Sequence, residues 1–97
     1  MKLKVEYIKS VVSELAKKYD IGRVILFGPY ARDEATDESI VSLAVDTCEV
    51  VFDKNFTKDL RDELEEDVEV FFLSDYNSNS ELRRNLDKGT IELYRKN

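Results

Sequence analysis

The chemistry that this 97-residue chain could support centres on a glycine-proline step and on acidic positions in neighbouring strands. Gly28 and Pro29 follow the apolar run 24–27. A glycine turn from a buried strand into a helix presents free backbone N–H groups and the positive end of the helix dipole, which suit a phosphate group. Phosphoryl or nucleotidyl transfer also needs two metal ions held by carboxylates. Acids at positions n and n+2 of one strand point the same way, and a third acid can come from the next strand.

The strands that would carry such acids are the runs 40–45 and 68–73. A period of two puts Val41, Leu43 and Val45 on the core face of the first strand, with Ile40, Ser42, Ala44 and Asp46 on its more mixed face. Asp46 lies roughly 13 Å beyond Ser42 along the strand, too far to act with it. Glu69 is the one charge inside the second run.

Hydrophobic spacing predicts the elements that position these residues. Apolar positions three and four apart predict a helix over about 3–19, and the run 24–27 predicts a central strand covered on both faces. A short helix is expected over 30–35, a helix over 57–66 with Thr57 as N-cap, and a helix after the capping box Ser78-x-x-Glu81. Residues 90–94 alternate like a strand but could be helical. The sequence does not decide the structure of segment 47–56: Val50–Phe52 could extend the preceding strand, form an edge strand or attach a loop to the core.

This order predicts one domain over residues 1–97, of α+β (or α/β-like) class, with a mixed sheet of three to four strands backed by helices. The net charge of −6 and the absence of long basic clusters disfavour nucleic acid and anionic membranes, and favour a basic or neutral protein partner. With no histidine and with Cys48 as the only cysteine, zinc and histidine catalysis are disfavoured, so catalysis would need carboxylates and a hard metal such as magnesium. Cys48 is expected to be a small half-buried residue, and the absence of a signal peptide or long apolar run predicts a cytoplasmic protein.

The stretch LFGPYARDEATDESIVSLAVD, residues 26–46, resembles the minimal nucleotidyltransferases of the DNA polymerase β superfamily. Their signature is an apolar strand, Gly-Ser, a helix and turn of about ten residues, and then Asp-apolar-Asp on the next strand. The resemblance extends over nearly the whole chain: strand 68–73 is similar to the one that carries the family's third acid. It implies a polymerase β-like fold and nucleotidyl transfer from a nucleoside triphosphate with Mg²⁺.

The departures from the family pattern fall on its reactive positions. Pro29 replaces the phosphate-binding serine, Asp33 replaces a glycine, and Ile40 and Ser42 replace the two metal-binding aspartates. Only Glu69 keeps an acid. The resemblance therefore implies a degenerate site in which Gly28, Pro29, Tyr30 and Arg32 are what is left of the phosphate loop. No cofactor and no metal site are expected.

For the remaining site positions, structural roles compete with functional ones. Glu69 is either a solvent-facing or ion-paired strand acid or a residual metal ligand. Arg32 either contacts a phosphate or forms a surface salt bridge with Asp33, Glu34 or Asp37. Tyr30 belongs either to the core or to a base-stacking platform.

The preferred function is a catalytically degenerate member of this fold that acts by binding a protein. Many members of the family are antitoxin-like partners of helical HEPN-domain proteins, so the resemblance implies a partner of that kind. Two alternatives stay open. One is a nucleotide-binding or active nucleotidyltransferase with atypical ligands, which would use Mg²⁺ and a nucleoside triphosphate, and the other is a structural homodimer.

Overall fold

The computed structural model describes residues 3–47 and 55–96. Cys48 and the run Val50–Phe52 lie outside the described residues, so the predictions for them stay untested. The elements follow one another as α1 (Val5–Lys18), β1 (Arg23–Phe27), β2 (Val41–Asp46), α2 (Asn55–Leu64), β3 (Val68–Phe72), the 3₁₀ turn η2 (Leu73–Asp75), α3 (Ser80–Asp87) and β4 (Ile91–Arg95). The predicted helices over 3–19, over 57–66 and after residue 78 and the strands over 24–27, 40–45 and 68–73 are confirmed within one or two residues, whereas the helix expected over 30–35 is absent. The segment 90–94, left open between strand and helix, contributes to the strand β4.

The four strands form one mixed sheet in the order β3-β2-β1-β4. β1 pairs antiparallel with β2 and with β4, whereas β2 and β3 run parallel. β1 is central, as its unbroken apolar run predicts, and four of its five residues are buried. The predicted α+β class with a mixed sheet backed by helices is therefore confirmed.

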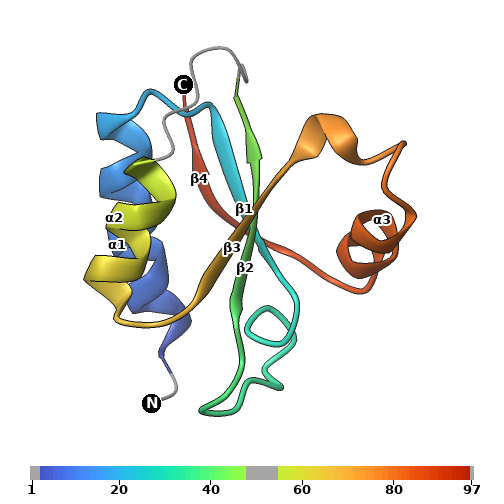
Figure 1. The fold of residues 1–97 in the computed structure, drawn as a ribbon, viewed down its shortest axis with the longest axis horizontal. Helices are drawn as coiled ribbons and strands as arrows, with labels where there is room; N and C mark the ends of the chain where they lie inside the picture. Colours follow the sequence, from blue (N-terminus) through green and yellow to red (C-terminus); the bar gives the residue numbers. More distant parts are fainter. Residues whose placement is uncertain (1–2, 48–54, 97) are drawn as a thin grey trace.

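Helices α1 and α2 pack side by side on one face of the sheet (Figure 1). Each turns a stripe of residues three or four apart towards the strands. The stripe of α1 buries Ile8, Val12 and Ala16, and that of α2 buries Phe56, Leu60 and Leu64. Together with Val41, Leu43 and Val45 of β2, they form the main core, as the period of two predicts.

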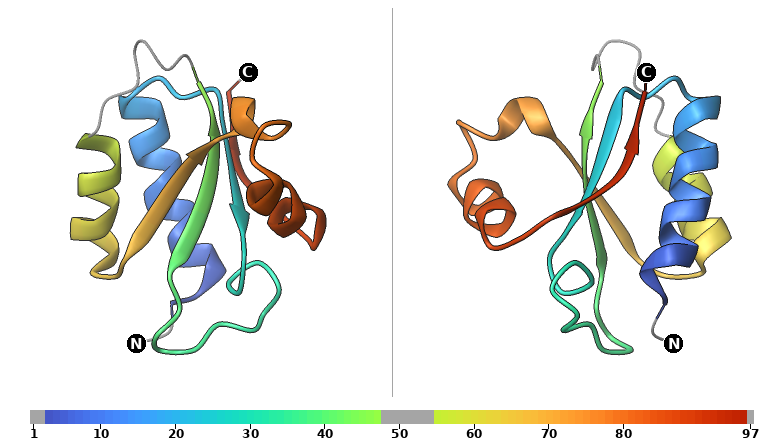
Figure 2. Two further views of the ribbon diagram at one scale, coloured as in Figure 1. Left: turned by 45° about the vertical axis from the view of Figure 1, so that its right-hand side comes forward. Right: turned by 180° about the vertical axis from the view of Figure 1, so that it is seen from behind.

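The opposite face of the sheet carries η2 and α3, as the two further views show (Figure 2). Its core is much smaller: Phe27, Ala44, Leu82 and Leu86 are its buried members. Phe71, Leu73 and Tyr76 pack against them at the margin. α3 therefore covers this face only in part.

Strand β4 contains a β-bulge that fixes how its side chains face. Val24 lies opposite Tyr94 and Ile25 opposite Glu92, so Leu93 is the extra residue. Its carbonyl accepts a hydrogen bond from the Ser13 hydroxyl of α1 at 3.3 Å. The bulge lets Leu93 and Tyr94 both pack against the main core.

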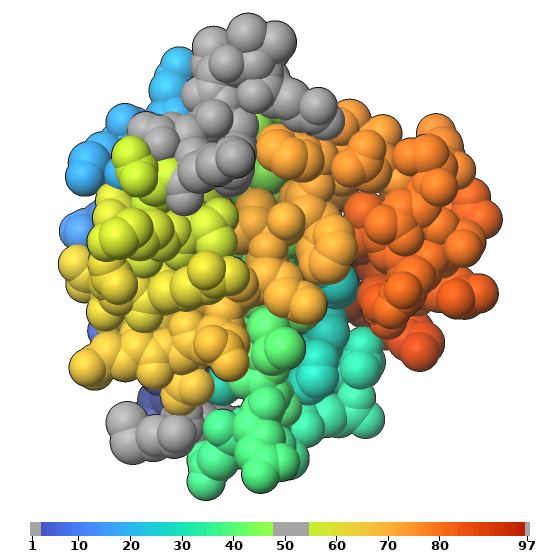
Figure 3. All heavy atoms as spheres, in the orientation of Figure 1, coloured from blue at the N-terminus to red at the C-terminus, as the bar shows by residue number. Residues whose placement is uncertain are grey.

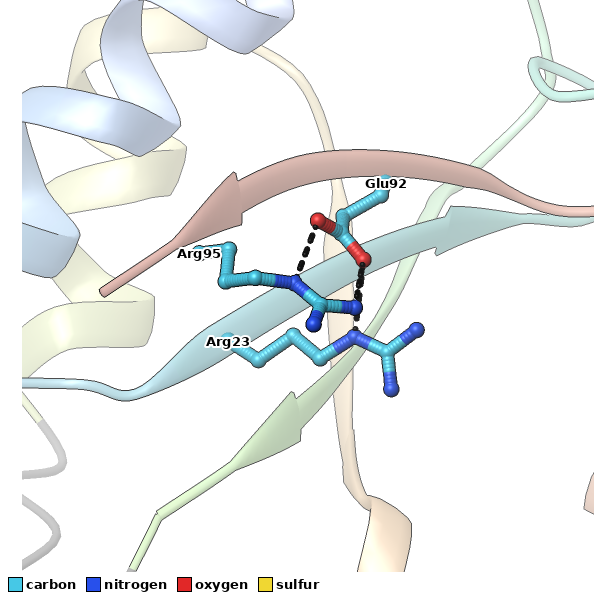
Figure 4. Close-up of polar contacts among 3 residues, drawn as sticks. All are labelled: Arg23, Glu92 and Arg95. Carbon is cyan, nitrogen blue, oxygen red and sulfur yellow. Dashed lines mark hydrogen bonds and ion pairs between the residues drawn. The ribbon is translucent and has the colours of Figure 1, made fainter. Parts of the chain in front are cut away.

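The same bulge brings Glu92 and Arg95, three residues apart, to one side of the strand (Figure 4). Arg95 Nη2 donates to Glu92 Oε2 at 2.8 Å, and Arg23 Nε donates to the same oxygen at 3.0 Å. Arg23 and Arg95 are cross-strand neighbours. Glu92 therefore offsets part of the repulsion between two like charges that face each other across β1 and β4.

Three local predictions are wrong. The helix expected over 30–35 is absent: residues 29–33 form hydrogen-bonded turns and 34–35 are irregular, because Asp33 adopts a left-handed conformation with φ of 56°. Thr57 lies inside α2, which begins at Asn55. The N-cap of α3 is Asn79, whose side chain accepts from the Leu82 N–H, while the Ser78 hydroxyl donates to the Asp75 carbonyl instead.

Across residues 3–47 and 55–96, none of the helices has both the length and the apolar character that crossing a membrane requires.

Candidate functional site

A cleft of about 320 Å³ opens between the sheet and α3 on the less covered face. In the space-filling view it lies between the gold surface of β3 and the orange-red surface of α3 (Figure 3). Four elements contribute to it: the end of β1 with the turn that follows, β2, β3, and α3 with its cap. The lining residues are Phe27, Gly28, Pro29, Arg32, Ser42, Glu69, Phe71, Asn79, Glu81, Leu82 and Asn85.

Gly28 forms one wall of the cleft where β1 ends. Its φ of 78° is in the region that favours glycine, and a Cβ there would come within 3.4 Å of the Ser42 hydroxyl oxygen. The Gly28 carbonyl accepts from the N–H groups of Ala31 and Arg32, at 3.0 and 3.2 Å. The chain therefore leaves the sheet directly after β1 through a tight hydrogen-bonded turn, and this turn brings Pro29 and Arg32 to the cleft.

Ser42 and Glu69 meet inside the cleft from adjacent parallel strands. They are register partners of β2 and β3, and the Ser42 hydroxyl donates to Glu69 Oε2 at 3.3 Å. Ser42 is buried and Glu69 is exposed. Two of the three acid positions of the family pattern therefore meet here, and they carry one hydroxyl and one carboxylate.

Arg32 makes the salt bridge expected of a surface arginine. Its Nε donates to Glu34 Oε1 at 2.6 Å, in agreement with one of the partners predicted from the sequence. Its Nη1 is buried and has no hydrogen-bond partner among the described residues. The Arg32 guanidinium is thus ion-paired through Nε, while its Nη1 is a hydrogen-bond donor with no partner among the described residues.

Helix α3 supplies the side of the cleft that sequence reasoning missed. Asn79, Glu81, Leu82 and Asn85 all line it. The spacing of Leu82 and Leu86 predicted a buried stripe on this helix, but it did not predict which face of the sheet the helix covers. Glu81 and Asn85 are one turn apart and flank that stripe, which is the sequence signal that could have identified them.

Some predicted site residues lie elsewhere. Tyr30 is buried in the main core, where its hydroxyl accepts from the Leu3 N–H at 3.5 Å. Ile40 precedes β2, is 39% exposed and does not line the cleft. Asp46 lies at the far end of β2, opposite Arg23. The structure therefore brings together Gly28, Pro29, Arg32, Ser42 and Glu69, and leaves out Tyr30 and Ile40.

The residues present do not fit a pair of magnesium ions. Such ions need several oxygen ligands with carboxylates among them, whereas Glu69 and Ser42 offer one carboxylate and a neutral hydroxyl. Within the two described ranges, no group of three or more acidic or thiol side chains could hold a metal ion. The donor set of the cleft is thus poor for two-metal chemistry.

Two solved toxin–antitoxin structures contain chains of the same fold. One, a toxin–antitoxin with AMP-PNP, aligns with a TM-score of 0.71 and 18% identity, over 91% of this chain and 73% of that chain. The other is a mutant of the toxin–antitoxin MntA-HpeT in which two aspartates are changed to glutamate. It aligns with a TM-score of 0.70 and 16% identity, over the same shares of the two chains.

At these identities the likeness shows the fold alone, and it agrees with the predicted α+β fold. No protein-family model matches the chain, and no curated protein matches it in sequence.

Proposed function

We propose that this protein is a catalytically degenerate nucleotidyltransferase-fold protein that acts by binding a protein partner. The observation that carries the proposal is the Ser42–Glu69 pair, in which a hydroxyl rather than a second carboxylate lies beside Glu69 on the neighbouring strand. Pro29 adds to it, since it removes a hydroxyl and a backbone donor from the turn that would hold a phosphate. The partner is of the helical HEPN type.

The two similar structures support a role in a protein pair, because both are toxin–antitoxin assemblies. In one of them the mutated aspartates are two positions apart, which is also the spacing of Ile40 and Ser42 here. The excess of acidic over basic residues, with a net charge of −6, suits a basic partner surface.

The catalytic half of the proposal is tested by incubating the purified protein with Mg²⁺ and each radiolabelled nucleoside triphosphate, alone and with its partner. We expect no labelled product above that of the Glu69→Ala variant. Losing one stabilising group typically lowers a rate by about 10²–10³-fold, and here several are missing together. Label transfer well above that control would refute the proposal.

The partner half is tested by affinity capture from the native host, followed by reconstitution of the complex from purified chains. We expect a defined complex with a helical protein, seen by light scattering as a mass above that of either chain. If the purified chain stays alone, or forms only a dimer with itself, partner binding is excluded as its function.

A second candidate is a protein that still binds a nucleotide with atypical ligands. The buried, unpartnered Nη1 of Arg32 favours it, because this donor suits a phosphate or base acceptor, and one similar structure was solved with AMP-PNP. Calorimetry with ATP, with and without Mg²⁺, separates the two candidates. Micromolar binding that is lost in Arg32→Ala would establish the second.

A further inference from the structure

We propose that the cleft between the sheet and α3 receives a basic side chain, an arginine or lysine, of the protein partner. This inference rests on the proposed function and names the chemistry of its contact. Glu69 and Glu81 both line this cleft, where a cation of the partner can reach them.

The charges around the cleft favour a cation. Arg32 is the one basic residue among the described residues that line it, and the Arg32 Nε is already paired with Glu34. Glu69 and Glu81 are exposed carboxylates that line the same cleft from opposite walls, β3 and α3. Once the Arg32–Glu34 pair is counted as neutral, two negative charges remain.

The hydrogen-bonding groups point the same way. An ionised carboxylate only accepts hydrogen bonds, and a guanidinium or ammonium group only donates them. Within the described residues, Glu69 Oε2 accepts one hydrogen bond, from the Ser42 hydroxyl at the long distance of 3.3 Å, so the carboxylate keeps room for stronger, charged donors. A triphosphate would instead place its negative charge against Glu69 and Glu81.

The walls suit the rest of such a side chain. Phe27 and Phe71 both line the cleft, with ring centroids 5.8 Å apart, and Leu82 adds an aliphatic surface from α3. Arginine and lysine bury their methylene stems on apolar surface and place the charged head at a polar end, and a guanidinium also stacks on aromatic rings. A volume of about 320 Å³ accommodates one such side chain.

The test is an NMR titration of the ¹⁵N-labelled protein at low salt with N-acetyl-arginine methylamide. The same titration with N-acetyl-citrulline methylamide, a neutral analogue of nearly equal shape, is the control ligand. We expect chemical-shift changes at the amides of Ser42, Glu69 and Phe71 with the arginine compound only. Glu69→Gln should weaken binding by about two- to tenfold.

Glu63→Gln is the matched control variant, because Glu63 is exposed on α2, on the other face of the sheet, and it should leave the titration unchanged. Added salt should weaken binding, since the groups are partly exposed. Equal responses to arginine and citrulline compounds, no response to either, or full binding by Glu69→Gln would each overturn the inference.

The two proposals fail separately. If the Glu69→Gln, Glu81→Gln variant binds the purified partner as tightly as the wild type, the partner docks elsewhere and the cleft assignment is wrong, while partner binding stands. If the cleft binds ATP rather than the arginine compound, both proposals are wrong.

Discussion

Ser42 is the residue whose identity most affects what the cleft can do. It lies beside Glu69 in the parallel register, so any side chain at this position points at that carboxylate. A hydroxyl there donates a hydrogen bond and adds no charge. An aspartate there would create a pair of facing carboxylates, which is a divalent-cation site at the cost of repulsion in the empty state.

The first prediction follows from that geometry. Ser42→Asp should destabilise the metal-free protein by about 1–3 kcal/mol, because it places a second negative charge at a buried position beside Glu69. Mg²⁺ should raise the melting temperature of Ser42→Asp part of the way back to the wild-type value. It should have little effect on the wild type or on the double variant that combines Ser42→Asp with Glu69→Gln. Thermal melts with and without Mg²⁺ measure both effects, and an equal response of all three proteins would contradict it.

Among the elements, β4 depends on a contact from outside the sheet. The bulge at Leu93 turns a backbone carbonyl away from the ladder, and the Ser13 hydroxyl of α1 satisfies it. Ser13→Ala should therefore cost about 1 kcal/mol of unfolding free energy, since it leaves this carbonyl without its donor. Urea denaturation measures the loss.

Ser10→Ala is the matched control on the same helix, where an exposed serine replaced by a better helix former should be neutral or slightly stabilising. If the two variants have the same stability, the bulge does not depend on Ser13.

The ion cluster on β4 and β1 makes stability depend on pH. The hydrogen bond from Arg95, and then that from Arg23, lower the pKa of Glu92 from 4.5 to about 2. Because the pKa of Glu92 is lower in the folded protein than in the unfolded chain, ionised Glu92 stabilises the fold fully above about pH 4.5. This stabilisation is lost as the pH falls from there towards about 2. Glu92→Gln should flatten the fall of the urea midpoint in that window, and salt should weaken the effect in the wild type. An unchanged pH profile in Glu92→Gln would refute this linkage.

An element can be predicted from the sequence where the local spacing of its apolar residues determines it, and not where tertiary contacts do. The stripes of α1 and α2 and the alternation of β2 repeat often enough to be read directly. The turn after Pro29 is different. Proline favours the start of a helix, but the left-handed Asp33 ends the turn before a helix forms, and no periodicity in the sequence indicates this. The capping-box pattern places the N-cap of α3 at Ser78, one residue early, because Ser78 and Asn79 are adjacent and both suit that position.

The candidate site was predictable where it depends on β-strand register. Ser42 and Glu69 occupy corresponding positions of neighbouring strands, so their meeting follows from the strand assignment. The family pattern places Ile40 with them, but β2 begins only at Val41 and Ile40 does not line the cleft. The α3 wall depends on how a helix crosses the sheet, which local patterns do not encode.

At the scale of the whole molecule, the two faces of the sheet are unequally covered. The main core joins α1 and α2 to all four strands, whereas α3 is held by a cluster with four buried members. Cooperative units with few buried apolar contacts open at lower free energy. α3 should therefore exchange its amide hydrogens faster than α1 and α2.

Native-state hydrogen exchange checks this, and Leu86→Ala should speed exchange in α3 much more than in α1. Equal protection of all three helices would show that the molecule opens only as a whole. A partner that docks in the cleft should slow exchange in α3 first, because it adds contacts to the least covered face.

The central place of β1 has a consequence for the order in which the chain can fold during synthesis. Of the four strands that the structure describes, β1 is made first, yet one of its two neighbours, β4, is made after the other three. Until residue 95 leaves the ribosome, β1 has an unpaired edge that a neighbouring nascent chain could join. Pairing of the second edge of β1 thus waits for the segment that follows α3, and a ribosome that stalls there would leave an aggregation-prone chain.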